Sequence, residues 1–299
     1  MPLFRTIRTW GEMIRFSHSV FALPFALMAA FLAGRKLASG VPTFRHLLLI
    51  VLCMIAARSF AMTCNRLADA AIDARNPRTA DRPLPAGRIS PGQAWAFLAA
   101  SAIAFVAGCA GFLLRYDNHW PLYLSLPTLA FLAGYSYTKR FTTLAHFCLS
   151  TGIGFAPPAA WIAIHPASLG LPAVLLTFAV MFWIGGFDII YACQDVEVDR
   201  REGLFSLPTR WGIAPALWVS RACHFVTVVA LAGFGIVSGL GWLYWIAVGL
   251  TAVLLTAEQA VVRPNDLSRV NLAFFTLNGC VSLVLGAATI VDVLWFGHR

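Results

Sequence analysis

Two stretches of the sequence place polar side chains four residues apart, and most of these side chains are aspartates. The first motif is Asn65, Asp69 and Asp73, and the second motif is Tyr191, Asp195 and Asp199. A spacing of four puts side chains on one face of a helix, one turn apart. Two carboxylates one turn apart repel each other, and a divalent cation removes that repulsion. We therefore predict that both motifs are helical and that their aspartates bind metal.

Magnesium fits such a site best. Mg²⁺ prefers oxygen ligands, keeps several waters, and usually takes one or two carboxylates together with phosphate oxygens of a substrate. We expect the four aspartates to face one another, with Asn65 beside them, and to hold two Mg²⁺ ions and a diphosphate. The alternative is a solvated helix end on which each aspartate pairs with a nearby arginine. Because the pattern occurs twice, each time before an arginine-rich loop, we favour the metal site.

Basic residues follow both motifs and also occur in a third segment, YSYTKR. The loops after the motifs contain Arg75, Arg78, Arg82, Arg88, Arg200, Arg201 and Arg210. Arginine suits phosphate because its guanidinium group makes paired hydrogen bonds. We predict that Arg82, Lys139 and Arg140 contact phosphate oxygens, since neighbouring Pro or Tyr residues constrain the chain there. The alternative for each arginine is a topological signal or contact with lipid headgroups.

The elements that must position these residues are apolar. Of the 299 residues, 59% are hydrophobic and only 12% are charged, and the mean hydropathy is +0.75. A soluble domain averages about 25% charged residues, so this chain has too little polar surface for a globule in water. We therefore predict a membrane protein whose partner is a lipid bilayer. The net charge of +9 comes from Lys and Arg gathered on one side of the expected spans, so no nucleic-acid partner is expected.

Nine apolar runs predict an all-α, polytopic membrane protein with about nine transmembrane helices. They cover about residues 18–40, 44–64, 93–114, 120–136, 143–164, 170–192, 214–235, 240–262 and 270–295. Most approach the ~20 residues that a helix needs to cross a bilayer. The side with more Lys and Arg is expected to be the inner one, which places the N-terminus in the cytoplasm.

The repeated spacing predicts a weak internal symmetry. Both motifs leave a span that runs from outside to inside, which suggests two four-helix halves plus a ninth helix within a single domain, 1–299. Most of the 13 acidic residues lie near these two span ends or in the loops after them, namely Asp69, Asp73, Asp81, Asp188, Asp195, Glu197, Asp199 and Glu202. Acids at a membrane edge are usually functional, which favours the metal site over a solvated helix end.

Three segments together resemble the UbiA superfamily of membrane prenyltransferases. They are NRLADAAIDARNPRTADRPLPAGRIS (65–90), YSYTKRFT (135–142) and DIIYACQDVEVDRREGLFSLPTRWG (188–212). The resemblance implies a helical bundle around a central cavity, capped on the cytoplasmic side by loops 65–92 and 193–213. It also implies Mg²⁺-dependent transfer of a polyprenyl chain from its diphosphate to an acceptor. Within the superfamily, the chain most resembles the 4-hydroxybenzoate polyprenyltransferases and the related enzymes of the futalosine menaquinone route.

The resemblance also assigns roles to single residues. It implies that Asn65 and the four aspartates organise Mg²⁺ and diphosphate, and that Arg82, Lys139 and Arg140 bind phosphate. Tyr191 stands where the first motif has Asn65, so a hydrogen bond to a phosphate oxygen or a carboxylate is expected in place of metal binding.

On the acceptor side, the expected residues are Arg58 and Asp188. Arg58 lies seven residues before Asn65, deeper in the apolar run. A buried cation needs an anion, so Arg58 is expected to bind a carboxylate of the acceptor. Asp188 either orients the acceptor or pairs with Arg58 or Arg221. Arg15 is a further candidate for substrate binding, and His18 is a candidate on the acceptor side or the phosphate side.

The sequence therefore predicts an enzyme of the inner membrane whose active site lies near the cytoplasmic face. The expected reaction prenylates an aromatic hydroxy acid of the 4-hydroxybenzoate type in ubiquinone or menaquinone biosynthesis, with a dihydroxynaphthoate acceptor as the alternative. A transporter of an anionic substrate is the alternative of another class. Transporters place polar residues near the bilayer midplane, whereas the acids here lie at span ends.

Overall fold

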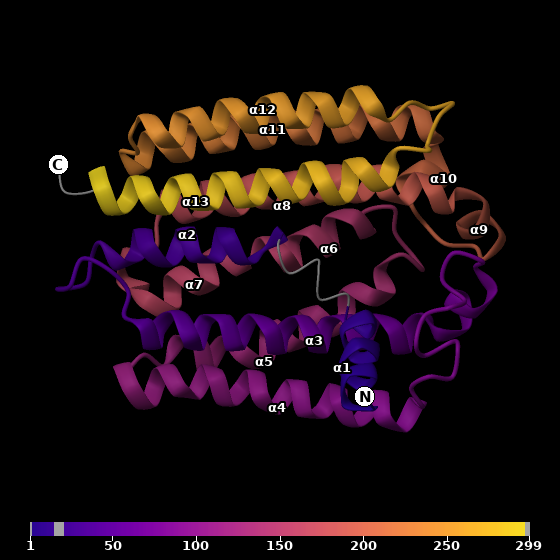
Figure 1. Ribbon diagram of the computed structural model, residues 1–299, viewed down its shortest axis with the longest axis horizontal. Helices are drawn as coiled ribbons and strands as arrows, with labels where there is room; N and C mark the ends of the chain where they lie inside the picture. Colours follow the sequence, from indigo (N-terminus) through magenta and orange to yellow (C-terminus); the bar gives the residue numbers. More distant parts are fainter. Residues whose placement is uncertain (1, 15–20, 297–299) are drawn as a thin grey trace. The chain divides into compact units, whose positions relative to one another are not determined.

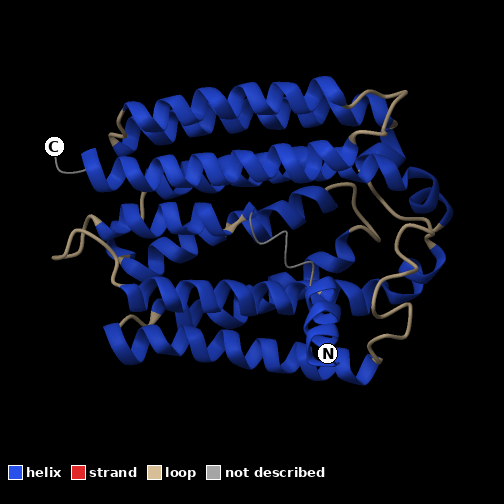
Figure 2. Ribbon diagram, in the orientation of Figure 1, coloured by secondary structure: helices blue, strands red, loops and turns tan. Residues whose placement is uncertain are grey.

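The computed structural model describes residues 2–14 and 21–296. These residues form helices joined by loops, and no strand occurs among them (Figure 2). A single isolated bridge between Arg263 and Asp266 closes a turn. The predicted all-α class is therefore confirmed.

The chain divides into two compact units, each described here by itself. The first unit contains α1 (Pro2–Met13), most of α3 (Phe44–Arg75), α4 (Pro91–Tyr116) and α5 (Trp120–Thr138). α3, α4 and α5 pack through a buried apolar cluster that includes Ala56, Phe105 and Leu129. α1 runs across the direction of α3 and α4 in Figure 1. Its Met13 is fully buried in a second cluster with Leu84 of the loop after the first motif.

Ser90 and Gln93 cap the beginning of α4. The Ser90 hydroxyl accepts a hydrogen bond from the backbone N–H of Gln93, and the Gln93 side chain accepts one from the backbone N–H of Ser90. This reciprocal arrangement satisfies two donors that the helix itself leaves unpaired. Pro91 occupies the first turn, where no N–H is needed. The arginine-rich loop after the first motif therefore has a well-defined end.

The second unit contains α2 and all elements from α6 onward. Their bounds are Leu23–Gly34 (α2), Ala145–Gly154 (α6), Ala156–Ile164 (α7), Leu171–Ala192 (α8), Cys193–Asp195 (η3), Val196–Arg201 (α9), Leu207–Trp211 (α10), Ile213–Ser238 (α11), Trp242–Val261 (α12), Leu272–Leu277 (η4) and Asn278–Phe296 (α13). A short 3-10 turn, Pro166–Ser168, joins α7 to α8.

α8 is the central element of the second unit. Helices α6, α7, α10 and α11 all pack against it, and α11 lies beside α12 (Figure 1). At the α8–α11 crossing, Ser220 donates a hydrogen bond of 2.8 Å to the carbonyl oxygen of Gly186. The missing side chain of Gly186 leaves the space that His224 fills. This close crossing fixes the part of α8 that leads to the second motif.

Among the described residues, seven helices are long and apolar enough to cross a membrane. They are Phe44–Arg75, Pro91–Tyr116, Ala145–Ile164, Leu171–Arg201, Ile213–Ser238, Trp242–Val261 and Leu272–Trp295. Large apolar side chains such as Leu114 and Ile236 are exposed along them, as expected for contact with lipid. The chain is therefore a multi-pass membrane protein.

The other two predicted spans are helical but fall outside this set. α2 has 12 residues, fewer than the ~20 that cross a bilayer. α5 has 19 residues and contains Pro127 inside the helix. The compact units do not follow the order of the sequence, because α2 belongs with the second unit although it precedes the first motif.

Candidate functional site

The first motif lies on a regular helix. α3 continues past the apolar run to Arg75, so Asn65, Asp69 and Asp73 stand on successive turns of one face. The Asn65 amide donates a hydrogen bond of 3.1 Å to Asp69 Oδ2. Asp69 and Asp73 are both buried, with 2% and 5% of their surface exposed. The predicted helix and its polar stripe are confirmed for this motif.

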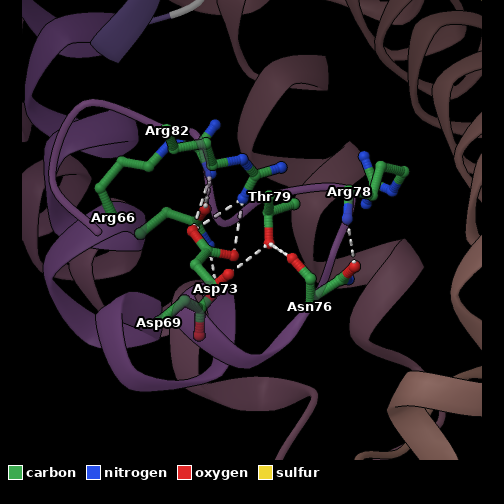
Figure 3. A network of polar contacts seen from close by, with 8 residues as sticks. Arg66, Asp69, Asp73, Asn76, Arg78, Thr79 and Arg82 are labelled. Carbon is green, nitrogen blue, oxygen red and sulfur yellow. Dashed lines mark hydrogen bonds and ion pairs between the residues drawn. The ribbon is translucent and has the colours of Figure 1, made fainter. Parts of the chain in front are cut away.

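Asp73 is the centre of a network of polar contacts (Figure 3). Arg82 Nη1 lies 2.7 and 2.8 Å from the two carboxylate oxygens, and Arg66 Nη1 lies 3.6 Å from Oδ2. Thr79 donates a hydrogen bond of 2.9 Å to the Asp73 carbonyl oxygen, which folds the loop back onto the helix end. The alternative interpretation, an aspartate paired with an arginine, therefore describes Asp73 in this structure.

Arg66 is a member of the network that the sequence analysis did not select. Its side chain is 4% exposed, and it follows Asn65 directly in the sequence. Position 66 is seven residues before position 73, so the two side chains share a helix face two turns apart. That spacing could have identified the pair. A buried ion pair of this kind becomes costly when one partner is removed, because the other charge is left uncompensated.

Tyr135 of α5 also belongs to the surroundings of the first motif. It interacts electrostatically with Arg58, Arg66 and Asp69. Arg58, predicted to bind an acceptor carboxylate, therefore lies in the same neighbourhood as the first motif. The prediction selected Lys139 and Arg140 from the segment YSYTKR and did not include Tyr135.

The second motif lies on an interrupted helix, which corrects the prediction of a regular polar stripe. α8 ends at Ala192, the 3-10 turn η3 covers Cys193–Asp195, and α9 begins at Val196. A 3-10 turn has about three residues per turn, so Tyr191, Asp195 and Asp199 do not stack as the first motif does. The Tyr191 ring packs against Phe274, with ring centroids 4.4 Å apart.

Asp199 is surrounded by polar groups of the segment that follows it. The Ser206 hydroxyl makes a hydrogen bond to its carboxylate, and Asp195, Lys139 and His146 act on it electrostatically. The Lys139 carbonyl oxygen accepts a hydrogen bond of 2.7 Å from the backbone N–H of Phe205. The backbone of Lys139 therefore lies beside the loop after the second motif. Lys139 is one of the residues predicted to bind phosphate.

Asp188 has a partner that the sequence analysis did not foresee. Its Oδ2 lies 2.7 Å from Nδ1 of His146 on α6, so its partner is not Arg221, one of the alternatives that the sequence left open. The guanidinium of Arg221 instead stacks over the Trp218 ring at 4.4 Å. His146 and Asp188 are 42 residues apart in the sequence, and the packing of α6 on α8 brings them together.

The donor set of each motif suits magnesium. Within the described part of the chain, no group of three or more His, Cys, Asp or Glu side chains is gathered closely enough to hold a metal. Each motif offers two carboxylates, and the first adds the amide of Asn65. Mg²⁺ commonly takes one or two carboxylates and completes its shell with waters and phosphate oxygens, so the residues present fit it. Arg15 and His18 lie outside the described residues.

A model described as the UbiA prenyltransferase family matches residues 22–279. The chain belongs to the UbiA prenyltransferase family. Membership identifies it as a prenyltransferase, which confirms the reaction class that the resemblance implied.

Relatives of this UbiA protein include an enzyme and two solved structures. It is 33% identical over 222 residues to the 4-hydroxybenzoate octaprenyltransferase of Actinobacillus pleuropneumoniae serotype 5b (strain L20), covering 74% of this chain and 73% of that protein. The apo structure of a UbiA homolog from Aeropyrum pernix K1 has a TM-score of 0.81 and 33% identity, covering 92% and 98%. A UbiA homolog from Archaeoglobus fulgidus bound to GPP and Mg²⁺ has the same fold, with a TM-score of 0.69, 19% identity, and coverage of 96% and 99%.

Proposed function

We propose that this enzyme transfers a polyprenyl chain from a polyprenyl diphosphate to an aromatic hydroxy acid of the 4-hydroxybenzoate type, in ubiquinone or menaquinone biosynthesis. The observation that carries the proposal is the 33% identity, over 74% of the chain, to a 4-hydroxybenzoate octaprenyltransferase. The bias of Lys and Arg supports an active site near the cytoplasmic face of the inner membrane.

On the diphosphate side, Asn65, Asp69, Asp73, Asp195 and Asp199 hold Mg²⁺ in this proposal. Four carboxylates in two pairs suit two ions. The metal supplies positive charge that stabilises the departing diphosphate. The binding of GPP and Mg²⁺ by the Archaeoglobus fulgidus homolog supports this proposal.

Three basic residues contact phosphate oxygens in the proposed complex. Arg82 is held at Asp73, and Lys139 is held near Asp199, so each cation stands beside a proposed metal-binding carboxylate. Arg140 follows Lys139 in the same segment. Fixed cations stabilise developing negative charge without having to reorganise during the reaction.

On the acceptor side, Arg58 binds the carboxylate of the aromatic acid, and Asp188 accepts a hydrogen bond from its hydroxyl. The allylic C–O bond breaks and its electron pair leaves with the diphosphate, a C–C bond forms at the ring carbon next to the hydroxyl, and the ring proton passes to a base. Water must be kept away, because it competes with the ring for the allylic carbon. The apolar helices around the motifs supply that protection.

The test uses the full chain in lipid nanodiscs with Mg²⁺, geranyl or longer diphosphates, and a panel of 4-hydroxybenzoate and dihydroxynaphthoate acceptors. Mass spectrometry is expected to find prenylated 4-hydroxybenzoate, and chelation of Mg²⁺ is expected to abolish it. Asp69→Asn is expected to be inactive. Asp117→Asn, a conservative change at a loop position with φ of 52°, serves as the matched control and should be fully active. Release of diphosphate without any prenylated aromatic product would contradict the proposal.

A further inference from the structure

His146 makes two directed contacts that together indicate the tautomer of its neutral ring. Its Nδ1 lies 2.7 Å from Asp188 Oδ2, and the backbone N–H of Leu207 donates to its Nε2 at 3.4 Å. Because Nε2 accepts a hydrogen bond, the ring hydrogen of the neutral imidazole is on Nδ1 and is donated to Asp188. The side chain of His146 is only 7% exposed, so its orientation is fixed by packing between α6, α8 and the beginning of α10.

This contact leaves one oxygen of Asp188 for another partner. Oδ2 receives the His146 hydrogen, while the side chain as a whole remains 22% exposed. A carboxylate offers about four lone-pair sites on its two oxygens. Asp188 Oδ1 is therefore able to accept a hydrogen bond from a hydroxyl group, with its direction set by the bond on Oδ2.

The same histidine connects Asp188 to the second motif. Leu207, whose N–H bonds His146, directly follows Ser206, and the Ser206 hydroxyl bonds the Asp199 carboxylate. The Ser206 hydroxyl also caps α10 by accepting from the Thr209 N–H at 3.3 Å. A continuous path of hydrogen bonds and one peptide link thus runs from Asp188 through His146 to Asp199.

We infer that His146 is a positioning residue for the aromatic acceptor. It orients Asp188 so that Oδ1 accepts the hydroxyl hydrogen of the acceptor, and it ties that carboxylate to the segment that carries Asp199. The inference rests on the proposed function, because it concerns the hydroxyl of the proposed acceptor.

The test compares two ligands that differ only by the hydroxyl group. Binding of 4-hydroxybenzoate and of benzoate is measured on the full chain in nanodiscs, together with the KM of each substrate. The wild-type protein should favour the hydroxylated ligand by about tenfold, the usual size of one hydrogen bond to a charged group. His146→Leu keeps an apolar side chain of similar size but has no donor. It should lose this preference and raise the acceptor KM by about tenfold, with the diphosphate KM almost unchanged.

A conservative variant separates positioning from packing. In His146→Gln the amide can donate to Asp188 and its oxygen can accept from the Leu207 N–H, so this variant should recover the preference for the hydroxyl. His119→Ala, an exposed histidine at the start of α5, is the control and should match the wild type.

Equal preference for the hydroxyl in His146→Gln and His146→Leu would overturn the inference, even if both variants lose activity. So would a parallel rise in both KM values, because that pattern indicates a purely structural role. If the wild-type protein prenylates no aromatic acceptor at all, the proposed function fails and the inference fails with it. An active wild-type protein with an unchanged ligand preference in His146→Leu would overturn the positioning role alone.

Discussion

The two aspartate motifs share one sequence spacing, but their carboxylates are held by different kinds of neighbour. In the first motif, α3 is regular and Asp73 is clamped between Arg82 and Arg66. In the second, a 3-10 turn interrupts the helix, and Asp199 is held by the Ser206 hydroxyl with Asp195 nearby. The first carboxylate is compensated by positive charge, whereas the second is stabilised mainly by hydrogen bonding. The same spacing therefore places arginine side chains beside the carboxylate in one unit and a serine hydroxyl beside it in the other.

Neutralising one aspartate in each motif should have the largest effect on catalysis. We expect both Asp73→Asn and Asp199→Asn to reduce kcat on the order of 10²–10³-fold or more, because each removes electrostatic stabilisation of the leaving group. Their effects on stability should differ. Asp73→Asn removes the carboxylate that faces the buried Arg66 and the partly buried Arg82, and it should lower the melting temperature. Asp199→Asn relieves repulsion from Asp195 and should not lower the melting temperature. Thermal unfolding in detergent measures this, and equal losses in both variants would contradict the contrast.

Removing the cation beside each aspartate should change the free energy of unfolding more in the first motif than in the second. Arg82→Ala breaks a partly buried ion pair of 2.7 Å and should destabilise the protein by about 3 kcal/mol. Lys139→Ala leaves the Ser206 bond to Asp199 in place and should cost no more than about 1 kcal/mol. Denaturant unfolding of the two variants side by side is the measurement. A larger loss for Lys139→Ala would show that the second motif also depends on charge compensation.

The hydroxyl of Ser206 offers a smaller test confined to the second motif. Ser206→Ala removes both the bond to Asp199 and the cap of α10, for an expected loss of about 1 kcal/mol. Thr79→Val is the corresponding change in the first motif, because it removes the bond to the Asp73 carbonyl but no contact to the carboxylate. We expect Ser206→Ala to raise the diphosphate KM severalfold and Thr79→Val to leave it almost unchanged. The reverse order of the two KM values would contradict the assigned role of Ser206.

Two carboxylates outside the membrane spans extend the comparison to pH and salt. Hydrogen bonds from Arg8 and Arg88 lower the pKa of Glu12 in the first unit. Hydrogen bonds from the Ser268 hydroxyl and backbone lower the pKa of Asp266 in the second. A lowered folded-state pKa means that the stabilising contribution is present above the pKa of the unfolded chain and is lost as the pH falls.

Added salt should distinguish the two carboxylates, because it screens ion pairs more than hydrogen bonds to neutral groups. We expect the pKa of Glu12 to rise with ionic strength more than that of Asp266, as followed by NMR titration of ¹³C-labelled protein. The variant Arg88→Gln is the control and should reduce the salt response of Glu12. A salt response of Asp266 as large as that of Glu12 would contradict the different causes given for the two lowered pKa values.

Much of the fold was predictable because it depends on local composition. Apolar runs of bilayer length mark most of the helices, and the four-residue spacing placed Asn65, Asp69 and Asp73 on one helical face. The aspartate pairs and arginine-rich loops predicted a site for Mg²⁺ and diphosphate, and the resemblance of three segments to the UbiA superfamily implied the reaction class. The apolar run at 18–40 predicted a longer helix than α2, which covers Leu23–Gly34.

The parts that could not be predicted depend on packing between distant segments. Nothing in the run CQD signals the 3-10 turn, since the apolar pattern of α8 continues up to it. Asp188 and His146 are separated by 42 residues and meet only because α6 packs on α8. Thr79 donates a hydrogen bond to the Asp73 carbonyl oxygen only because the loop after α3 folds back onto the helix end.

The central claim is that carboxylates of both motifs act on one diphosphate through Mg²⁺. Calorimetric titration of geranyl diphosphate into the full chain in nanodiscs, with and without Mg²⁺, tests it most directly for the wild type, Asp69→Asn and Asp195→Asn. We predict Mg²⁺-dependent binding to the wild type and its loss in both variants, while each variant keeps the wild-type elution profile and helical content. Undiminished Mg²⁺-dependent affinity in either variant would contradict the claim.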